Sequence, residues 1–222
     1  MAFSGGLDSS IVTKCATKYS NVVTCTAFVR GAGDDARARS AARELGVEHV
    51  SAELNAENVG AVLTELDLPF APTLMDRSLW CLYRIVARSA HDAGIRILLL
   101  GQLADELFGG YAKYSRALSI VGEEAARSMM RSDLQEYARR GRVRDVGACA
   151  RWVEPRFPFE TPILVETASN LPISYKIRQG VTKAVLRRAA IKVGVPEGIA
   201  GLAKKAAQYS SGVQRLVAGL PF

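Results

Sequence analysis

The stretch Ser4-Gly5-Gly6-Leu7-Asp8-Ser9-Ser10 lies between a short apolar run, residues 1–3, and a helical pattern over residues 7–19. Gly5 and Gly6 can adopt positive φ and let a ligand approach the backbone. The N-terminus of the following helix offers unpaired N–H groups and a partial positive charge, and the serine hydroxyls add hydrogen-bond donors. The stretch therefore predicts a phosphate-binding loop at the end of a first strand.

An aspartate in this loop, Asp8, distinguishes it from the commoner phosphate loop, whose GxxxxGK[ST] pattern and lysine do not occur here. A carboxylate beside phosphate needs a cation between them. Asp8 is therefore interpreted as a Mg²⁺ ligand shared with the phosphates of a nucleotide. The alternative is structural, because Asp8 and Ser9 also favour a first helical turn and the glycines a tight turn.

A second motif follows the apolar run at residues 95–100 and reads Gly101-Gln102-Leu103-Ala104-Asp105-Glu106-Leu107-Phe108-Gly109-Gly110-Tyr111. Its acids come just beyond the carboxyl end of a predicted strand, where open α/β sheets bind their ligands. If this strand neighbours the first, Asp105 can approach the same Mg²⁺ as Asp8. A capped helix followed by a glycine turn is the structural alternative.

Apolar runs and helical patterns alternate over residues 1–120, which predicts βαβ units with a parallel sheet. The expected strands are residues 1–3, 22–29, 49–52 and 95–100, and the expected helices are residues 7–19, 34–45, 56–66 and 77–93. Helical patterns continue over residues 123–139, 161–170 and 180–193. We expect one domain over residues 1–222, with an α/β nucleotide-binding core at 1–120 and a mainly helical extension at 121–222.

Composition restricts the class of protein. The 222 residues are 49% hydrophobic and include no apolar run long enough to span a membrane, so we expect a soluble, cytoplasmic protein. The four cysteines contain no CxxC pair, which favours buried packing over zinc binding or disulfides. The net charge of +7, concentrated at residues 127–156 and 176–205, suits an anionic partner but equally suits solvated helix faces.

The first motif resembles the SGGxDS pyrophosphate loop of the ATP pyrophosphatases, and the second resembles the GxxADELFGGY signature of asparagine synthetase and β-lactam synthetase. The resemblance implies a three-layer parallel sheet of the adenine nucleotide alpha hydrolase type with a C-terminal helical extension. It also implies cleavage of ATP between the α and β phosphates. By analogy Asp8 and Asp105 bind Mg²⁺, and Tyr111 lies near the acyl-adenylate. The expected nucleotide contacts are Ser4, Gly5, Gly6, Asp8, Ser9, Ser10, Phe28 and Gly101.

The resemblance continues along the chain in the RD pair at residues 144–145, in residues 153–159 and in residues 183–187. The family places a catalytic lysine before a polar turn near the end, which here is Lys204 or Lys205. Such a lysine would stabilise negative charge on the α-phosphate and the attacked carbonyl in the transition state. Without the family, Arg156 and Lys183 fit exposed charges on or near helices, and Lys204 and Lys205 fit a solvated terminal helix.

Three departures from the family pattern bear on the reaction. Ala2 stands where complete asparagine synthetases carry the glutaminase cysteine, so we expect nitrogen from free ammonia, an amine or a separate glutaminase. Gln102 replaces a glutamate thought to handle the proton of the nucleophile, and glutamine cannot act as a base. Glu106, Glu154 or Tyr111 would then take that role, or the reaction differs. Because the first strand is short, we also expect the native start to lie upstream of Met1.

The expected activity is an ATP- and Mg²⁺-dependent ligase that adenylates a carboxylate, aspartate or a similar acid, with Tyr111, Glu106 and Lys204 or Lys205 as catalytic residues. One alternative is a tRNA-modifying pyrophosphatase, disfavoured by the second motif and by the lack of aromatic residues among the basic ones. Another is a nucleotide-binding regulatory subunit with weak catalysis. The acyl substrate and the oligomeric state, including a homo-oligomer, stay open.

Overall fold

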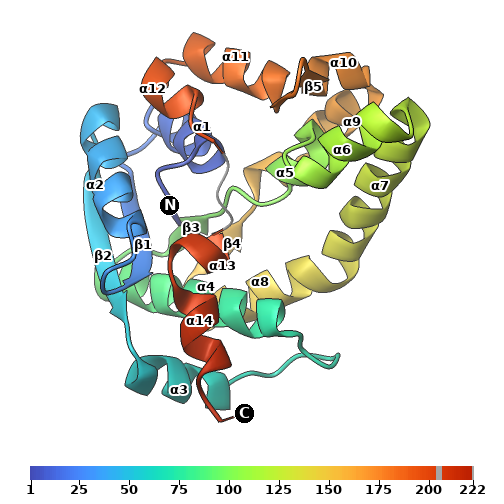
Figure 1. Ribbon diagram of the computed structural model, residues 1–222. Helices are drawn as coiled ribbons and strands as arrows, with labels where there is room; N and C mark the ends of the chain where they lie inside the picture. The colour runs from blue at the N-terminus through green and yellow to red at the C-terminus, as the bar shows by residue number, and fades with distance from the viewer. Residues whose placement is uncertain (204–206, 222) are drawn as a thin grey trace.

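The computed structural model describes residues 1–203 and 207–221 and has an α/β fold (Figure 1). Its strands are β1 (Val23–Val29), β2 (Glu48–Leu54), β3 (Ile97–Leu99), β4 (Glu154–Arg156), β5 (Ile177–Arg178) and β6 (Val181–Thr182). The helices in the first 120 residues are α1 (Leu7–Ala16), α2 (Asp34–Leu45), α3 (Ala56–Thr64), α4 (Leu74–Asp92), α5 (Ala104–Phe108) and α6 (Ala112–Ile120).

Helices make up most of the second half of the chain. They are α7 (Glu123–Glu136), α8 (Arg142–Cys149), α9 (Pro162–Asn170), α10 (Ile173–Lys176), α11 (Ala184–Lys192), α12 (Glu197–Ala200), α13 (Ala207–Ser210) and α14 (Val213–Ala218). A π-helical turn, Tyr137–Gly141, joins α7 to α8, and a 3₁₀ turn, Pro158–Glu160, precedes α9. No helix in residues 1–203 or 207–221 is both long and apolar enough to cross a membrane.

Two parallel strand pairs, β1 with β2 and β3 with β4, are joined by the first three residues of the chain. The Ala2 amide donates to the Leu99 carbonyl at 2.9 Å, while the Phe3 amide donates to the Cys25 carbonyl at 2.8 Å. The segment thus lies between β1 and β3, as the position of the N-terminus in Figure 1 also shows. Residues 4–10 and 101–111 therefore leave neighbouring strands at their carboxyl ends, as the sequence predicts.

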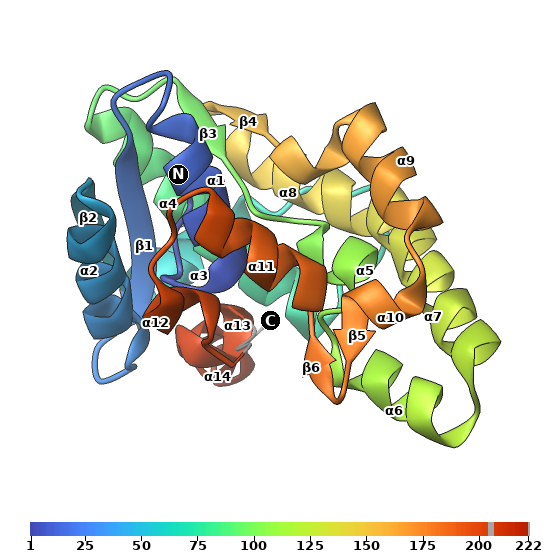
Figure 2. The same cartoon turned by 90° about the horizontal axis from the view of Figure 1, so that it is seen from above.

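The two faces of these strands bury different apolar clusters, because successive side chains of a strand point to opposite sides. Cys25, Ala27 and Leu98 pack with α3, α4 and α14, whereas Met1 and Phe3 pack with α1, α2, α11 and α12. In Figure 2 helices α5 to α10 lie to one side of the strand region. Cys25, Cys81 and Cys149 are buried, as expected, while Cys15 is half-buried.

Helix boundaries follow local capping signals. Helix α2 coincides with its prediction because Gly46 ends it in the left-handed region at φ 70°. Helix α4 begins three residues earlier than predicted, at Leu74, because Thr73 and Asp76 form a capping box.

The prediction of a helix over residues 180–193 is wrong at its start. β5 and β6 form a hairpin there, with Gln179 and Gly180 both at positive φ, and α11 begins only at Ala184. β4 was not predicted, since it has three residues and a central proline that gives no strand signal.

Candidate functional site

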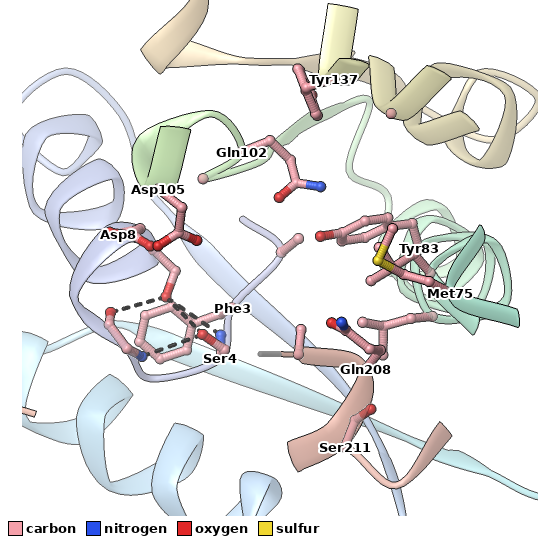
Figure 3. A pocket seen from close by; sticks show the side chains of 18 of the residues that line it. Phe3, Ser4, Asp8, Met75, Tyr83, Gln102, Asp105, Tyr137, Gln208 and Ser211 are labelled. Carbon is pink, nitrogen blue, oxygen red and sulfur yellow. Dashed lines mark hydrogen bonds between the residues drawn. The ribbon is translucent and has the colours of Figure 1, made fainter. Parts of the chain in front are cut away.

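A cavity of about 710 Å³ opens at the carboxyl ends of the 1–3 segment and β3. Its lining comes from both predicted motifs, from α4, from the π turn after α7, and from the segments around Lys183 and Gln208. Figure 3 shows Asp8 and Asp105 on one side and Gln102, Tyr83, Met75 and Tyr137 toward the other. Residues remote in the sequence therefore share one site.

The glycine–serine loop is held by its own hydroxyls. The Gly6 amide donates to the Ser4 hydroxyl at 3.4 Å, and the Ser9 hydroxyl donates to the Gly6 carbonyl at 3.2 Å (Figure 3). Gly5 has a φ of 68°, and a Cβ there would lie 3.0 Å from the Arg37 carbonyl oxygen. Glycine is therefore required both by the backbone conformation and by the close packing of the loop on α2.

The second motif lies directly against the first. A Cβ on Gly101 would approach the Ser9 amide nitrogen at 3.3 Å and the Asp8 Cβ at 3.4 Å. Leu103 then turns the chain with a φ of 74°, uncommon for a leucine, so that Asp105 and Glu106 lie in the first turn of α5. This turn presents both acids to the cavity.

Asp8 and Asp105 meet at a third residue, Lys183. Its Nζ lies 2.7 and 2.5 Å from the two carboxylate oxygens of Asp8 and 2.6 Å from Oδ1 of Asp105. The Lys183 side chain is 3% exposed, so the exposed charge expected from the sequence taken alone is wrong. Arg156 is exposed and pairs with Glu154, in agreement with that expectation.

Asp8 and Asp105 form an oxygen donor set that fits Mg²⁺. Their oxygens already converge on one cation, the Lys183 ammonium, and Mg²⁺ prefers carboxylate, phosphate and water oxygens. Within residues 1–203 and 207–221, no group of three or more acidic, histidine or cysteine side chains could hold a metal.

Glu106 and Tyr111 form a hydrogen-bonded pair in the cavity lining, with the Tyr111 hydroxyl 2.8 Å from Oε1 of Glu106. Burial raises the pKa of Glu106, against the lowering effect of the Tyr111 hydrogen bond. Burial and the neighbouring Glu106 carboxylate raise the pKa of Tyr111 far above its ordinary value. Tyr111 is thus the hydrogen-bond donor of this pair and Glu106 is the acceptor.

Gln102 is hydrogen-bonded to a group of charged side chains on the opposite wall, of which Asp145, Arg144 and Asp76 are buried. Its Nε2 donates to Oδ2 of Asp145 at 2.6 Å, and Arg144 bridges Asp145 at 2.8 Å and Asp76 at 3.0 Å. Arg140 reaches the other oxygen of Asp76 at 3.1 Å. The carboxylate of Asp145 accepts hydrogen bonds, which fixes the amide nitrogen of Gln102 toward it.

The structure brings most of the expected site residues together. The cavity is lined by Ser4, Gly6, Asp8, Ser9, Gly101, Asp105, Glu106 and Tyr111. Gly5, Ser10 and Phe28 do not line it; the Ser10 hydroxyl is fully buried, so it adds no donor to the cavity. Glu154 is exposed and outside the lining. Lys204 and Lys205 lie outside the described residues.

Comparison with known proteins agrees with this geometry, since the sequence matches the asparagine synthase family over residues 1–144 and 119–220. The chain belongs to this family. The matched ranges include both the loop at residues 4–10 and the acids after β3.

Individual relatives share modest identity with this member of the family. A protein of Methanocaldococcus jannaschii, provisionally named asparagine synthetase [glutamine-hydrolyzing] 1, is 29% identical over 96% of this chain and 46% of its own length. Asparagine synthetase B [glutamine-hydrolyzing] of Escherichia coli is 24% identical over 95% of this chain and 40% of its own. Asparagine synthetase domain-containing protein 1 of Mus musculus is 29% identical over 62% of this chain and 22% of its own length. The chain thus spans less than half the length of each of these relatives.

Proposed function

We propose that this chain is an ATP-dependent amide-forming ligase that adenylates a carboxylate with release of pyrophosphate. It then passes the acyl group to a nitrogen nucleophile with release of AMP. The observation that carries the proposal is the convergence of Asp8 and Asp105 on one point beside the glycine–serine loop. Two carboxylates at a phosphate-binding loop make sense where a cation and a polyphosphate bind together. Relatives named asparagine synthetase support an amide as the product.

Different parts of the site take different roles in this reaction. The loop at residues 4–10 binds phosphate through its backbone and hydroxyl donors, while Asp8 and Asp105 hold Mg²⁺. When bound, Mg²⁺ neutralises charge on the leaving pyrophosphate. Glu106, whose pKa is raised by burial, accepts the proton of the attacking nitrogen, since Gln102 cannot. Lys204 or Lys205 stays our prediction for the cation that stabilises the adenylation step.

We further infer that β1–β4 and residues 1–3 form one parallel sheet at the centre of a three-layer fold. Residues 1–222 then form one domain, in which residues 121–222 complete the site. Aspartate is the first acyl substrate to test, and ammonia, an amine or a separate glutaminase is the nitrogen source. A homo-oligomer and a cytoplasmic location stay predictions. RNA as a partner is disfavoured, because many arginines in the 127–156 stretch pair with carboxylates, among them Arg127, Arg131, Arg140, Arg142, Arg144 and Arg156.

The decisive experiment measures AMP and pyrophosphate release from Mg·ATP across a panel of carboxylates, with ammonium present. We expect release with aspartate or a related acid, lowered at least about a hundredfold in Asp8→Asn, because the metal site loses a charged ligand. Glu106→Gln should instead keep carboxylate-dependent ATP–pyrophosphate exchange and slow amide formation by about a hundredfold. ATP binding without release for any carboxylate would favour the regulatory subunit and contradict the ligase.

A further inference from the structure

The ammonium of Lys183 occupies the point on which the two site carboxylates converge. Nζ contacts both oxygens of Asp8 and one oxygen of Asp105 at 2.5–2.7 Å, and the side chain is almost wholly enclosed. Mg²⁺ binds carboxylate oxygens at about 2.0–2.1 Å and needs the same space. The ammonium and a metal ion therefore cannot both lie between these carboxylates.

The fold holds Lys183 in this position. The residue has a φ of 55°, in the left-handed region, directly before α11. A left-handed conformation is unfavourable for a non-glycine residue, so the surrounding structure must impose it. Arg187, one turn later, donates to the Thr182 carbonyl at 2.8 Å and to the Ala200 carbonyl at 2.6 Å, which anchors this end of the helix.

Gly110 makes room for the contact. A Cβ at this position would overlap both the Asp105 carboxylate and the end of the Lys183 side chain. The second motif therefore contributes a glycine whose absent side chain allows the lysine to reach the acids. The lysine, the two acids and the glycine form one packed unit.

The charges of this unit indicate that the lysine compensates the repulsion between the two carboxylates. Two carboxylates facing the same space repel each other when no cation lies between them. One ammonium removes half of that negative charge, and a divalent cation would remove all of it. An ammonium tethered through the fold also acts at a high effective concentration compared with a free ion.

We propose that Lys183 is a positioning residue that keeps Asp8 and Asp105 assembled in the nucleotide-free protein and excludes divalent cations until nucleotide phosphate accompanies them. The inference rests on the proposed function for the identity of the two metal ligands. It adds an order of events, in which free metal does not load the site and the lysine leaves when the metal–nucleotide complex enters.

The test measures Mn²⁺ binding in the absence of nucleotide by electron paramagnetic resonance. We expect Lys183→Met to bind Mn²⁺ at least about tenfold more tightly than wild type, because a competing positive charge at contact distance is removed. Lys192→Met, an exposed lysine at the end of the same helix, should match wild type. In Lys183→Met with Asp105→Asn the gain should disappear, since one of the two acids is neutral.

Thermal unfolding gives a second readout that needs no activity. Lys183→Met should unfold at a lower temperature than wild type in EDTA and recover several degrees in millimolar Mg²⁺, whereas wild type should shift by less than about 1 °C. Lys183→Gln, which keeps donors and loses the charge, serves if Lys183→Met does not fold. Equal Mn²⁺ affinity in wild type and variants, or a gain that persists in Asp105→Asn, would overturn the inference. If the Lys183 variants lose ligase activity without these changes in Mn²⁺ affinity and unfolding temperature, the proposed function stands and this inference is refuted.

Discussion

At the scale of single residues, the contact between Gln102 and Asp145 restricts which side chain position 102 tolerates. Gln102 donates to Oδ2 of Asp145 at 2.6 Å, and Asp145 is fully buried beside Arg144. A glutamate at 102 would place a second carboxylate against the first. Buried like charges of this kind force one group to stay protonated or destabilise the fold.

We therefore expect Gln102→Glu to lower the free energy of unfolding by about 2 kcal/mol, since a hydrogen bond is replaced by a like-charge contact. Asp145→Asn alone should cost about 3 kcal/mol, because it leaves Arg144 with less charge compensation. The double variant, again with one carboxylate and one amide, should be at least about 1 kcal/mol more stable than the sum predicts. Urea unfolding of the four proteins measures this coupling.

A matched control for these variants is Gln135→Glu, the same chemical change at an exposed helix position, which should stay within about 0.5 kcal/mol of wild type. Strict additivity of Gln102→Glu and Asp145→Asn would mean that the 2.6 Å contact contributes nothing. In that case electrostatics would not explain why glutamine occupies position 102.

The residues that could be predicted from the sequence are those whose chemistry is local. Asp8 and Asp105 each follow a strand-like run, and parallel strands end at the same edge, so their approach was predictable. Lys183 lies 175 residues from Asp8, and Asp145 lies 43 residues from Gln102. Nothing in the local pattern around Lys183 distinguishes a buried ion pair from an exposed helix charge, so its role required the tertiary structure.

At the scale of elements, the N-terminus of α4 joins the cavity wall to α8. Thr73 and Asp76 form its capping box, and the Asp76 carboxylate also accepts hydrogen bonds from Arg144 and Arg140. Burial works against the charged form, but hydrogen bonds from Thr73, Arg140 and Arg144 outweigh it and hold the pKa of Asp76 below its ordinary value. One carboxylate thus caps a helix and ties two other segments to it.

We expect Asp76→Asn to lower the free energy of unfolding by about 3 kcal/mol at pH 7, because it breaks a buried ion pair. A lowered pKa contributes stability above the unfolded value, about 3.9, and loses it as the pH falls toward the folded value. The difference between wild type and Asp76→Asn should therefore shrink below about pH 4. Urea unfolding between pH 3 and pH 7 measures it.

The control for the helix is Asp92→Asn, at the exposed C-terminal end of α4, for which a change within about 0.5 kcal/mol is expected. A pH-independent loss in Asp76→Asn would show that the capping geometry matters and the ion pairs do not.

Boundaries of elements were predictable where a cap or a glycine marks them, as Gly46 does for α2. They were missed where tertiary contacts decide them, as in the β5–β6 hairpin and in β4, which pairs in parallel with the distant strand β3. The short length of these strands leaves too few residues for a period of two to appear.

At the scale of the whole molecule, the cavity joins the beginning, middle and end of the chain. Phe3 and Ser4 line it together with Tyr83 and Gln102, and Gln208 and Ser211 close it from below in Figure 3. A ligand that contacts all of these segments stabilises the folded chain by about 2.7 kcal/mol at a hundredfold excess over its Kd. Local openings around the cavity should respond more strongly than distant ones.

Hydrogen exchange with Mg²⁺ and α,β-methylene ATP, which cannot be cleaved between those phosphates, tests this connection. We expect amides of residues 4–10, 102–106 and 208–212 to exchange at least about tenfold more slowly with the ligand, because local opening would break ligand contacts. Amides of α9, which is largely exposed and lines no part of the cavity, should change less than about twofold. Protection confined to residues 4–10 would mean that the C-terminal segment does not close over the nucleotide. The site would then be an open phosphate loop.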